Sequence, residues 1–212
     1  MKQNYEFNNM IKTEEELQSI IGFPSDLVKN KVITYLDHHC LDFISKSPFL
    51  VLSTSDKYGF CDVSPRGDQT GFVQVLSDRQ LVIPERPGNK RVDSLRNILS
   101  NPRVGLLFFI PSMGETLRVN GKATLVSDEE ILEKMAVNNK KPLLGIHVEV
   151  EECFIHCAEA FKRSGLWDPH TWPDQNMLPS AAKMIFDHAK LPNTSVESIQ
   201  DRLDEGYLKR LY

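Results

Sequence analysis

Two adjacent basic residues stand where a loop meets a predicted helix, and their position suits the binding of an anion. In the segment Pro87-Gly-Asn-Lys-Arg91, the first two residues break a strand pattern, and helical apolar spacing begins directly after the last. The charges of Lys90 and Arg91 therefore lie beside free backbone N–H groups at a helix N-terminus, where a phosphate is favoured. The glycine spacing fits neither a Walker loop nor a GxGxxG fingerprint. The segment indicates a phosphate site, with a solvated basic loop as the alternative.

Other reactive side chains form no recognisable catalytic set. The run His38-His39-Cys40 contains metal-ligand types, but adjacent helical residues point about 100° apart, so we expect no metal there. His156 and Cys157 are neighbours in the chain, which does not place a base against a thiol, and we expect both to be structural. The sequence therefore leaves any catalytic residue unassigned.

Composition describes an ordinary soluble domain. The chain has 212 residues, 41% of them hydrophobic, which is enough for a full core in one domain with extensions. Its net charge of −4 argues against a nucleic-acid surface. The four cysteines fit no disulfide framework, and neither a signal-peptide pattern nor a membrane-spanning apolar run is present, so we expect reduced cysteines in a cytoplasmic protein.

The middle of the chain reads as strands and its ends as helices. Strand patterns cover residues 49–55, 60–65, 72–76, 80–83, 103–110, 115–126 and 143–152. Pro65 suggests a strand end or a sheet edge. Residues 115–126 allow either a hairpin at Asn120-Gly121 or one long strand with a bulge at Gly121. The pattern as a whole predicts an α+β domain built on a small barrel.

Capping boxes mark several helix starts. Thr13, Ser127 and Thr194 each precede a glutamate by three residues. They predict helices that end near residues 21, 138 and 211, respectively. Further helices are expected around residues 24–33, at 37–45, 92–101 and 181–188, and in the second half of 154–164, after a short strand.

The order of these elements resembles the pyridoxamine 5′-phosphate oxidase family, whose members fold as a split β-barrel and bind FMN. The blocks that carry the resemblance are Asp62-Val-Ser-Pro-Arg-Gly67, Leu81-Val-Ile-Pro84, Gly88-Asn-Lys-Arg91, Asn101-Pro-Arg-Val-Gly-Leu-Leu-Phe108 and Arg118-Val-Asn-Gly-Lys122. A further block, residues 156–169, resembles the branch usually called probable FMN-dependent enzymes. The resemblance implies an α+β split barrel with N- and C-terminal helices. It divides the chain into a helical extension packed on the barrel (1–48), the FMN-binding barrel (49–168) and a helical tail (169–212).

The resemblance also implies roles for individual residues. Lys90 and Arg91, with Asn89 beside them, would grip the FMN phosphate, and the backbone of Ile83 and Pro84 would pass along the ribityl chain and ring. Ser64, Pro65, Arg66 and Gly67 would line the other side of the flavin. Thr116 and Arg118 would reach the ring, where a cationic side chain stabilises a reduced flavin. Lys162, Arg163, Ser164 and Trp167 would complete the site of the partner subunit in a homodimer.

These roles predict an FMN-dependent oxidoreductase that acts on an unidentified small molecule, with NADH or NADPH as a candidate electron donor. The vitamin B6 oxidases end in an Arg-x-His signature that this chain lacks, which argues against that substrate. Two other readings stay open: a non-catalytic flavin-binding module, and a haem-binding or haem-degrading split barrel with His147, His156 or His170 as axial ligand.

Overall fold

The computed structural model describes residues 5–209 and 211–212, and the chain divides into two compact units, residues 1–32 and 33–212. The first unit contains α1 (Glu14–Ile21) and α2 (Asp26–Asn30), neither of which buries a residue. Thr13 caps α1 by accepting the Glu16 N–H, as its capping box predicts. The division at residue 32 does not test the predicted boundaries at 48 and 168, which stay predictions.

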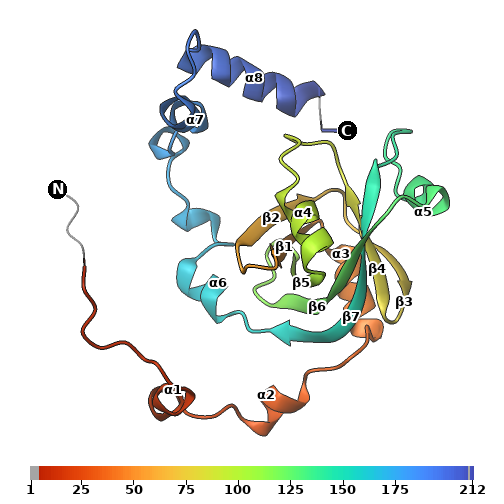
Figure 1. The fold of residues 1–212 in the computed structure, drawn as a ribbon, viewed down its shortest axis with the longest axis vertical. Coiled ribbons are helices and arrows are strands. Elements are labelled where there is room, and N and C mark those ends of the chain that lie inside the picture. The colour runs from red at the N-terminus through yellow and green to blue at the C-terminus, as the bar shows by residue number, and fades with distance from the viewer. Residues whose placement is uncertain (1–4, 210) are drawn as a thin grey trace. The chain divides into compact units, whose positions relative to one another are not determined.

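The second unit contains a seven-stranded antiparallel sheet, with its strands in the order β2-β1-β5-β6-β7-β4-β3 (Figure 1). Its strands are β1 (Phe49–Ser55), β2 (Cys61–Gly67), β3 (Gln74–Ser77), β4 (Gln80–Glu85), β5 (Arg103–Phe109), β6 (Thr116–Val126) and β7 (Leu144–His156). The edges are β2 and β3, so Pro65 lies in an edge strand, where a missing N–H costs no ladder hydrogen bond. The sheet and its helices confirm the α+β split barrel.

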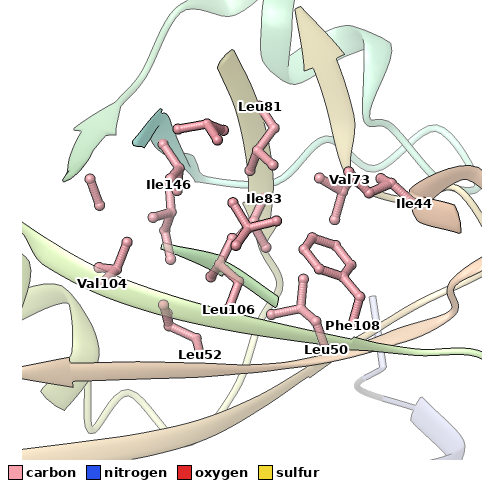
Figure 2. Close-up of a cluster of buried hydrophobic side chains, with 14 of the residues drawn as sticks. Ile44, Leu50, Leu52, Val73, Leu81, Ile83, Val104, Leu106, Phe108 and Ile146 are labelled. Carbon is pink, nitrogen blue, oxygen red and sulfur yellow. The ribbon is translucent and has the colours of Figure 1, made fainter. Parts of the chain in front are cut away.

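The core lies between the facing sides of the curled sheet. Figure 2 shows Leu50 and Leu52 of β1, Leu106 and Phe108 of β5 and Leu81 and Ile83 of β4 converging on one another. All six are at most 1% exposed. Alternate residues of each strand point into this core because strand side chains alternate between faces. Burial of this surface, at about 25 cal/mol per Å², is what holds the barrel together.

The helices of the second unit are α3 (His38–Lys46), α4 (Asp93–Ser100), α5 (Glu129–Lys134), α6 (Glu159–Ser164), α7 (Ala181–Ala189) and α8 (Val196–Lys209), with 3-10 turns at Pro169–Thr171 and Gln175–Met177. α3 contributes Cys40, Phe43 and Ile44 to the core. α4 packs on β1, β2 and β6 (Figure 1). It buries Leu95 and Ile98. No helix in the described part of the chain is long and apolar enough to cross a membrane.

Residues 116–126 form one long strand, so the hairpin alternative is wrong. The β6–β7 register shifts between Asn120 and Gly121, as the bulge alternative predicts. Asn120 pairs with Glu152 and Gly121 with Val150, so the residue without a partner is Glu151, on β7. The bulge is therefore carried by the neighbouring strand. The Glu151 side chain forms ion pairs with Arg103 and Lys122.

Two helix starts differ from the prediction. α5 begins after Asp128, with no side-chain cap, and ends at Lys134, before the predicted residue 138. Ser195, not Thr194, caps α8 by accepting the Ser198 N–H, while the Thr194 hydroxyl donates to the Leu191 carbonyl. A serine can bond to backbone groups in several local geometries, and the sequence does not decide which one forms. α8 is described to Lys209, and residue 210 of its predicted continuation lies outside the described residues. Leu211, its predicted end, is described and is not helical.

Candidate functional site

A cavity of about 440 Å³ lies where the edge strand β2, the end of β4 and the start of α4 meet. The predicted site residues that line it are Ser64, Pro65, Arg66, Gly67, Pro84, Asn89 and Arg91. Its volume falls within the range of small-molecule sites, roughly 300–1,000 Å³. The structure thus brings the β2 segment and the basic loop together.

A polar network attaches the start of α4 to β2. Ser94, the second residue of α4, is buried and donates to Asp62 Oδ2 at 2.5 Å. Its Oγ lies 3.0 Å from Ser64 Oγ and also accepts a bond from Arg66 Nη2 at 3.3 Å. Arg66 Nε donates to Ser64 Oγ at 3.1 Å. These bonds fix the helix start at the cavity wall, and no buried side-chain polar atom among the described residues lacks a partner.

The loop before α4 has an unusual backbone. Lys90 and Val92 adopt φ of 63° and 53°, the left-handed region that side-chain-bearing residues rarely occupy, and a β-branched valine is an outlier there. Asn89 Oδ1 accepts the Arg91 N–H at 2.9 Å. Val92 is the N-cap of α4, and it supplies no side-chain cap to the first-turn N–H groups. Backbone strain of this kind collects at ligand-binding sites.

Three arginines line the cavity, and each has a carboxylate partner: Arg66 pairs with Glu85, Arg86 with Asp68, and Arg91 with Asp93. The pairs differ in exposure, because the side chain of Arg91 is 78% exposed and that of Arg66 only 14%. The hydrogen bond and charge of Asp93 raise the pKa of Arg91, which is therefore charged at any ordinary pH. An exposed ion pair exchanges partners easily, so Arg91 is the arginine best placed to turn to a ligand.

The pair formed by Arg86 and Asp68 is part of a larger buried network. Arg86 Nε donates to Asp68 Oδ2 at 2.6 Å, and its Nη2 donates to the Met135 carbonyl at 2.8 Å. The Tyr212 hydroxyl donates to Asp68 Oδ1 at 2.7 Å, and Arg86 lies over the Tyr212 ring. Burial acts to raise the pKa of Asp68, but bonds from Tyr212, the Gln69 N–H and Arg86 outweigh it and hold that pKa below its ordinary value. Asp68 is therefore an ionised anchor behind the cavity wall.

The remaining predicted barrel residues lie elsewhere. Ile83 points into the core, so only its backbone could approach a ligand (Figure 2). Lys90 belongs to the basic loop but does not line the cavity. Thr116 is buried in β6, and Arg118 lines a different cavity.

This second cavity, of about 540 Å³, lies on the outer face of β1, β5 and β6. Arg118 Nε donates to Asn120 Oδ1 at 3.3 Å, and its guanidinium lies 5.6 Å from the centre of the Phe154 ring. His156 also lines this cavity. A smaller cavity of about 250 Å³ shares Cys61 with the second cavity and Arg91 with the first, so the two sites are neighbours.

The predicted partner-reaching block surrounds a third hollow of about 280 Å³, lined by Lys162 and Trp167 among others. Trp167 stacks on Phe161 and donates through Nε1 to the Met113 carbonyl at 2.9 Å. Arg163 lies 3.7 Å from Glu159, and the Ser164 hydroxyl donates to the Phe161 carbonyl. No residue of the block lines the first cavity of its own chain.

Five polar residues of the first cavity were not predicted as site residues: Asp62, Glu85, Arg86, Asp93 and Ser94. The period of two along β2 places Asp62 on the face of Ser64 and Arg66, and this signal could have found it. No comparable signal exists for Glu85 and Arg86. They reach the cavity because β4 ends there, which depends on the fold of the sheet.

The run His38-His39-Cys40 does not converge, since Cys40 is buried while both histidines are exposed. Asp37, His38 and His39 do bring ligand-type atoms within 4.8 Å of one another. The Asp37 carboxylate, however, already caps α3 by accepting the Cys40 N–H at 2.9 Å. We assign no metal site to this group.

Comparison with known proteins identifies the family. The family model described as pyridoxamine 5′-phosphate oxidase matches residues 36–157, more than half of the chain. The chain belongs to the pyridoxamine 5′-phosphate oxidase family. The matched region of this family member begins just before α3 and ends just after β7, so it covers the whole sheet. No curated protein matches the sequence.

Solved structures with similarity to this family member include three from bacteria. HupZ of Group A Streptococcus is 18% identical, with a TM-score of 0.43, and the match covers 54% of this chain and 88% of that one. An FMN-binding protein of Syntrophomonas wolfei is 10% identical, with a TM-score of 0.42 and coverage of 55% and 88%. HutZ, the haem storage protein of Vibrio cholerae, is 15% identical, with a TM-score of 0.42 and coverage of 57% and 94%.

Proposed function

We propose that this protein binds FMN and is an FMN-dependent oxidoreductase acting on a small molecule. The observation that carries the proposal is the first cavity, where an exposed arginine and an uncapped helix start face a hollow of ligand size. An anion at a helix N-terminus is stabilised by free N–H groups and by the helix dipole. Membership of the pyridoxamine 5′-phosphate oxidase family supports FMN as the ligand.

The residues of the cavity fit a phosphate if some of them bind it and others hold the cavity wall in place. Arg91 would turn from Asp93 to the phosphate, and Lys90, one residue away in the strained loop, would add a second charge. Arg66 would stay with Glu85, because breaking a buried ion pair leaves a charge without a partner. Arg66 would then shape the wall and orient Ser64 and Ser94, whose hydroxyls can bond to a ligand.

When bound, FMN supplies the hydride- and electron-transfer chemistry, and the protein supplies grip, orientation and charge. Arg118 lines the second, neighbouring cavity, which could receive a substrate. Asn120 orients this arginine from one side and the Phe154 ring supports it from the other. Arg118 would thus hold an anionic group of a substrate or of the reduced ring.

FMN titration of the purified protein, followed by flavin fluorescence, tests the cofactor. We expect binding at micromolar protein with FMN preferred over FAD, and much weaker binding of riboflavin, which lacks the phosphate. Equal affinity for FMN and riboflavin would argue against the phosphate site. Addition of NADH or NADPH to the loaded protein then tests the oxidoreductase. Bleaching followed by turnover supports an enzyme, whereas a bound flavin that no reductant bleaches supports the non-catalytic module.

The outer face of β1, β2 and β5 supports the proposal of a homodimer. This face exposes Phe49 and Val63, which flank the Val51 and Leu107 that line the second cavity. A second copy is the simplest cover for an exposed apolar sheet face and edge strand. The α6 block would then reach the flavin site of the partner subunit.

Light scattering with absorbance detection measures the mass and the flavin content of the assembly together. Arg163→Ala should weaken FMN binding by the dimer, while Lys183→Ala, on the exposed face of α7, should not. Unchanged FMN affinity in Arg163→Ala would remove the block from the site, and a fully loaded monomer would refute the shared site.

Haem is the second candidate ligand, because His156 lines the second cavity beside Arg118. An imidazole could supply an axial ligand, and an arginine could pair with a haem propionate. A Soret band that is lost in His156→Ala would support haem and refute the flavin assignment. We expect no such band.

A further inference from the structure

Two cysteines outside the proposed flavin site lie against each other in the core. Cys40 of α3 and Cys153 of β7 are 113 positions apart, and their Sγ atoms lie 3.2 Å apart in a thiol hydrogen bond. Their residues are only 7% and 0% exposed. Two structural cysteines could fill this volume without contact between their sulfur atoms, so the contact is a feature to be explained.

The two thiols have different surroundings. Cys40 is the third residue of α3, and its N–H is bonded to the capping carboxylate of Asp37. A thiolate is favoured at a helix N-terminus. The hydrogen bond from Cys153 lowers the pKa of Cys40 and outweighs burial and the Asp37 carboxylate, which raise it, while the same bond and burial raise the pKa of Cys153. Cys40 is thus the more acidic thiol, and Cys153 is its proton-bearing neighbour.

The backbone holds both cysteines in place. Cys153 exchanges two hydrogen bonds with Ile33, with N···O distances of 2.7 and 3.0 Å. Its side chain is enclosed by the core, directly across the sheet from Val119. A disulfide has an S–S distance of about 2.05 Å, so closing this pair needs a movement of only about 1 Å. The pair is preorganised for bond formation.

We infer that Cys40 and Cys153 form a redox-active dithiol that hydrogen peroxide closes into a disulfide. The Cys40 thiolate attacks the peroxide O–O bond, which gives a Cys40 sulfenic acid and hydroxide. The Cys153 sulfur then attacks the Cys40 sulfur, the S–O bond breaks, and water leaves as the Cys153 proton is transferred. The two cysteines lose two electrons in total, and the peroxide is reduced to two water molecules once hydroxide takes up a proton.

The consequence is a covalent link between α3 and β7 inside the barrel. The link is reversible by an external dithiol, as expected of disulfides in a reducing compartment. The proposal does not depend on flavin, because neither cysteine lines the first or the second cavity. Cys61 and Cys157 are exposed and free, so they provide an internal comparison in the same chain.

Thiol labelling tests the proposal on the intact protein. The reduced protein is treated with hydrogen peroxide and then denatured in the presence of N-ethylmaleimide, which labels free thiols. Its peptides are measured by mass spectrometry, with an untreated sample as control. We expect the peptides of Cys40 and Cys153 to appear disulfide-linked, and dithiothreitol to restore both labels. Labels on both buried cysteines after peroxide treatment would overturn the proposal, as would a sulfinic acid on Cys40 with Cys153 still free.

A double variant removes the competing thiols without altering the core. Cys61→Ser with Cys157→Ser changes only exposed positions and keeps the pair. Its peroxide-treated form should melt at a higher temperature than its reduced form, since the link closes a long loop. In the matched Cys153→Ala variant, peroxide should not raise the Tm. Equal melting temperatures of the oxidised and reduced double variant would contradict the link.

Discussion

At the scale of single residues, exposure distinguishes the arginines of the first cavity. Arg66 and Arg86 are largely buried and tied to carboxylates, so they hold the wall together. Arg91 is mostly exposed, and its partner Asp93 can be replaced by another anion. All three side chains are positively charged, but only Arg91 is in a position to exchange partners.

Arg91→Ala should therefore weaken FMN binding by about ten- to a hundredfold, the effect of losing one charge-assisted hydrogen bond. Riboflavin binding should hardly change, since riboflavin carries no phosphate. Fluorescence titration of both ligands measures the difference. Arg96→Ala, on the exposed face of α4, is the matched control and should keep wild-type affinity. An Arg91→Ala protein with unaltered FMN affinity would reduce the segment to a solvated loop.

The left-handed backbone of Val92 leads to a prediction about stability. Strain at such a residue costs of order 1–3 kcal/mol. Glycine removes this strain, and it is also acceptable at an N-cap. Val92→Gly should thus raise the free energy of unfolding by about 1 kcal/mol, which thermal or urea unfolding can measure.

The control for Val92→Gly is Val63→Gly, at an exposed and extended position of β2. There, glycine relieves no strain, removes strand preference, adds chain entropy and trims the proposed dimer face, so we expect destabilisation by roughly 1 kcal/mol or more. If both variants were destabilised alike, Val92 would not be strained.

At the scale of elements, the bulge between β6 and β7 depends on one glycine. A Cβ atom at Gly121 would lie 2.1 Å from the Glu149 carbonyl oxygen, a backbone atom that cannot move without shifting β7. Gly121→Ala should therefore cost roughly 2–4 kcal/mol of unfolding free energy. Gly88→Ala, where a Cβ would meet nothing within 4 Å, is the matched control and should be close to neutral. Equal unfolding free energies in urea for the two variants would mean that β7 adjusts freely.

Elements were predictable where local chemistry decides them. The alternation of Leu50 and Leu52 on β1 and the apolar run of β5 identified strands, because each side chain reports its own face. The length of β6 could not be decided locally, since Asn120-Gly121 suits a turn and a bulge equally well. The cap of α8 was misplaced because Thr194 and Ser195 are equally good candidates.

The site was predictable only in part. Its basic loop and β2 segment could be found because their residue types and spacing stand out. The carboxylates of Asp68 and Glu85 could not, because Glu85 meets Arg66 only after β2 and β4 are brought together by the whole sheet. Asp93 differs, since it lies only two residues from its partner Arg91. Charge balance at this cavity is a property of tertiary structure.

At the scale of the whole molecule, Tyr212 is bonded to Asp68, 144 positions away. The pKa of Asp68 is lowered in the folded state. Its ionised form therefore stabilises the fold at pH values above the ordinary pKa of an aspartate, which is about 4. This contribution is lost as the pH falls through the lower, folded-state pKa. Loss of the hydroxyl in Tyr212→Phe should cost about 1 kcal/mol at pH 7.

The difference between Tyr212→Phe and wild type should shrink as the pH falls below about 4 and then through the lowered pKa of folded Asp68, where this carboxylate takes up a proton. Melting temperatures at pH 7, 5 and 3 follow this trend. Tyr207→Phe, an exposed tyrosine on α8, is the matched control and should have no effect at any of these values. A pH-independent loss in Tyr212→Phe would point to packing on Arg86 instead of the bond to Asp68.

The split of the barrel leaves a weak line between the edge strand β2 and the end of β4, where no backbone hydrogen bonds join the two strands. β2 has a backbone partner on one side only, and ion pairs of side chains, Arg66 with Glu85 and Arg86 with Asp68, connect it and the residue after it to the end of β4. In contrast, β6 has a backbone hydrogen-bond ladder on both of its sides. Amide hydrogen exchange should therefore be faster in residues 61–67 than in 116–126. Because both ion pairs are largely buried, salt should change this difference little. The first cavity lies along this line, so the local opening that admits deuterium there would also admit a ligand.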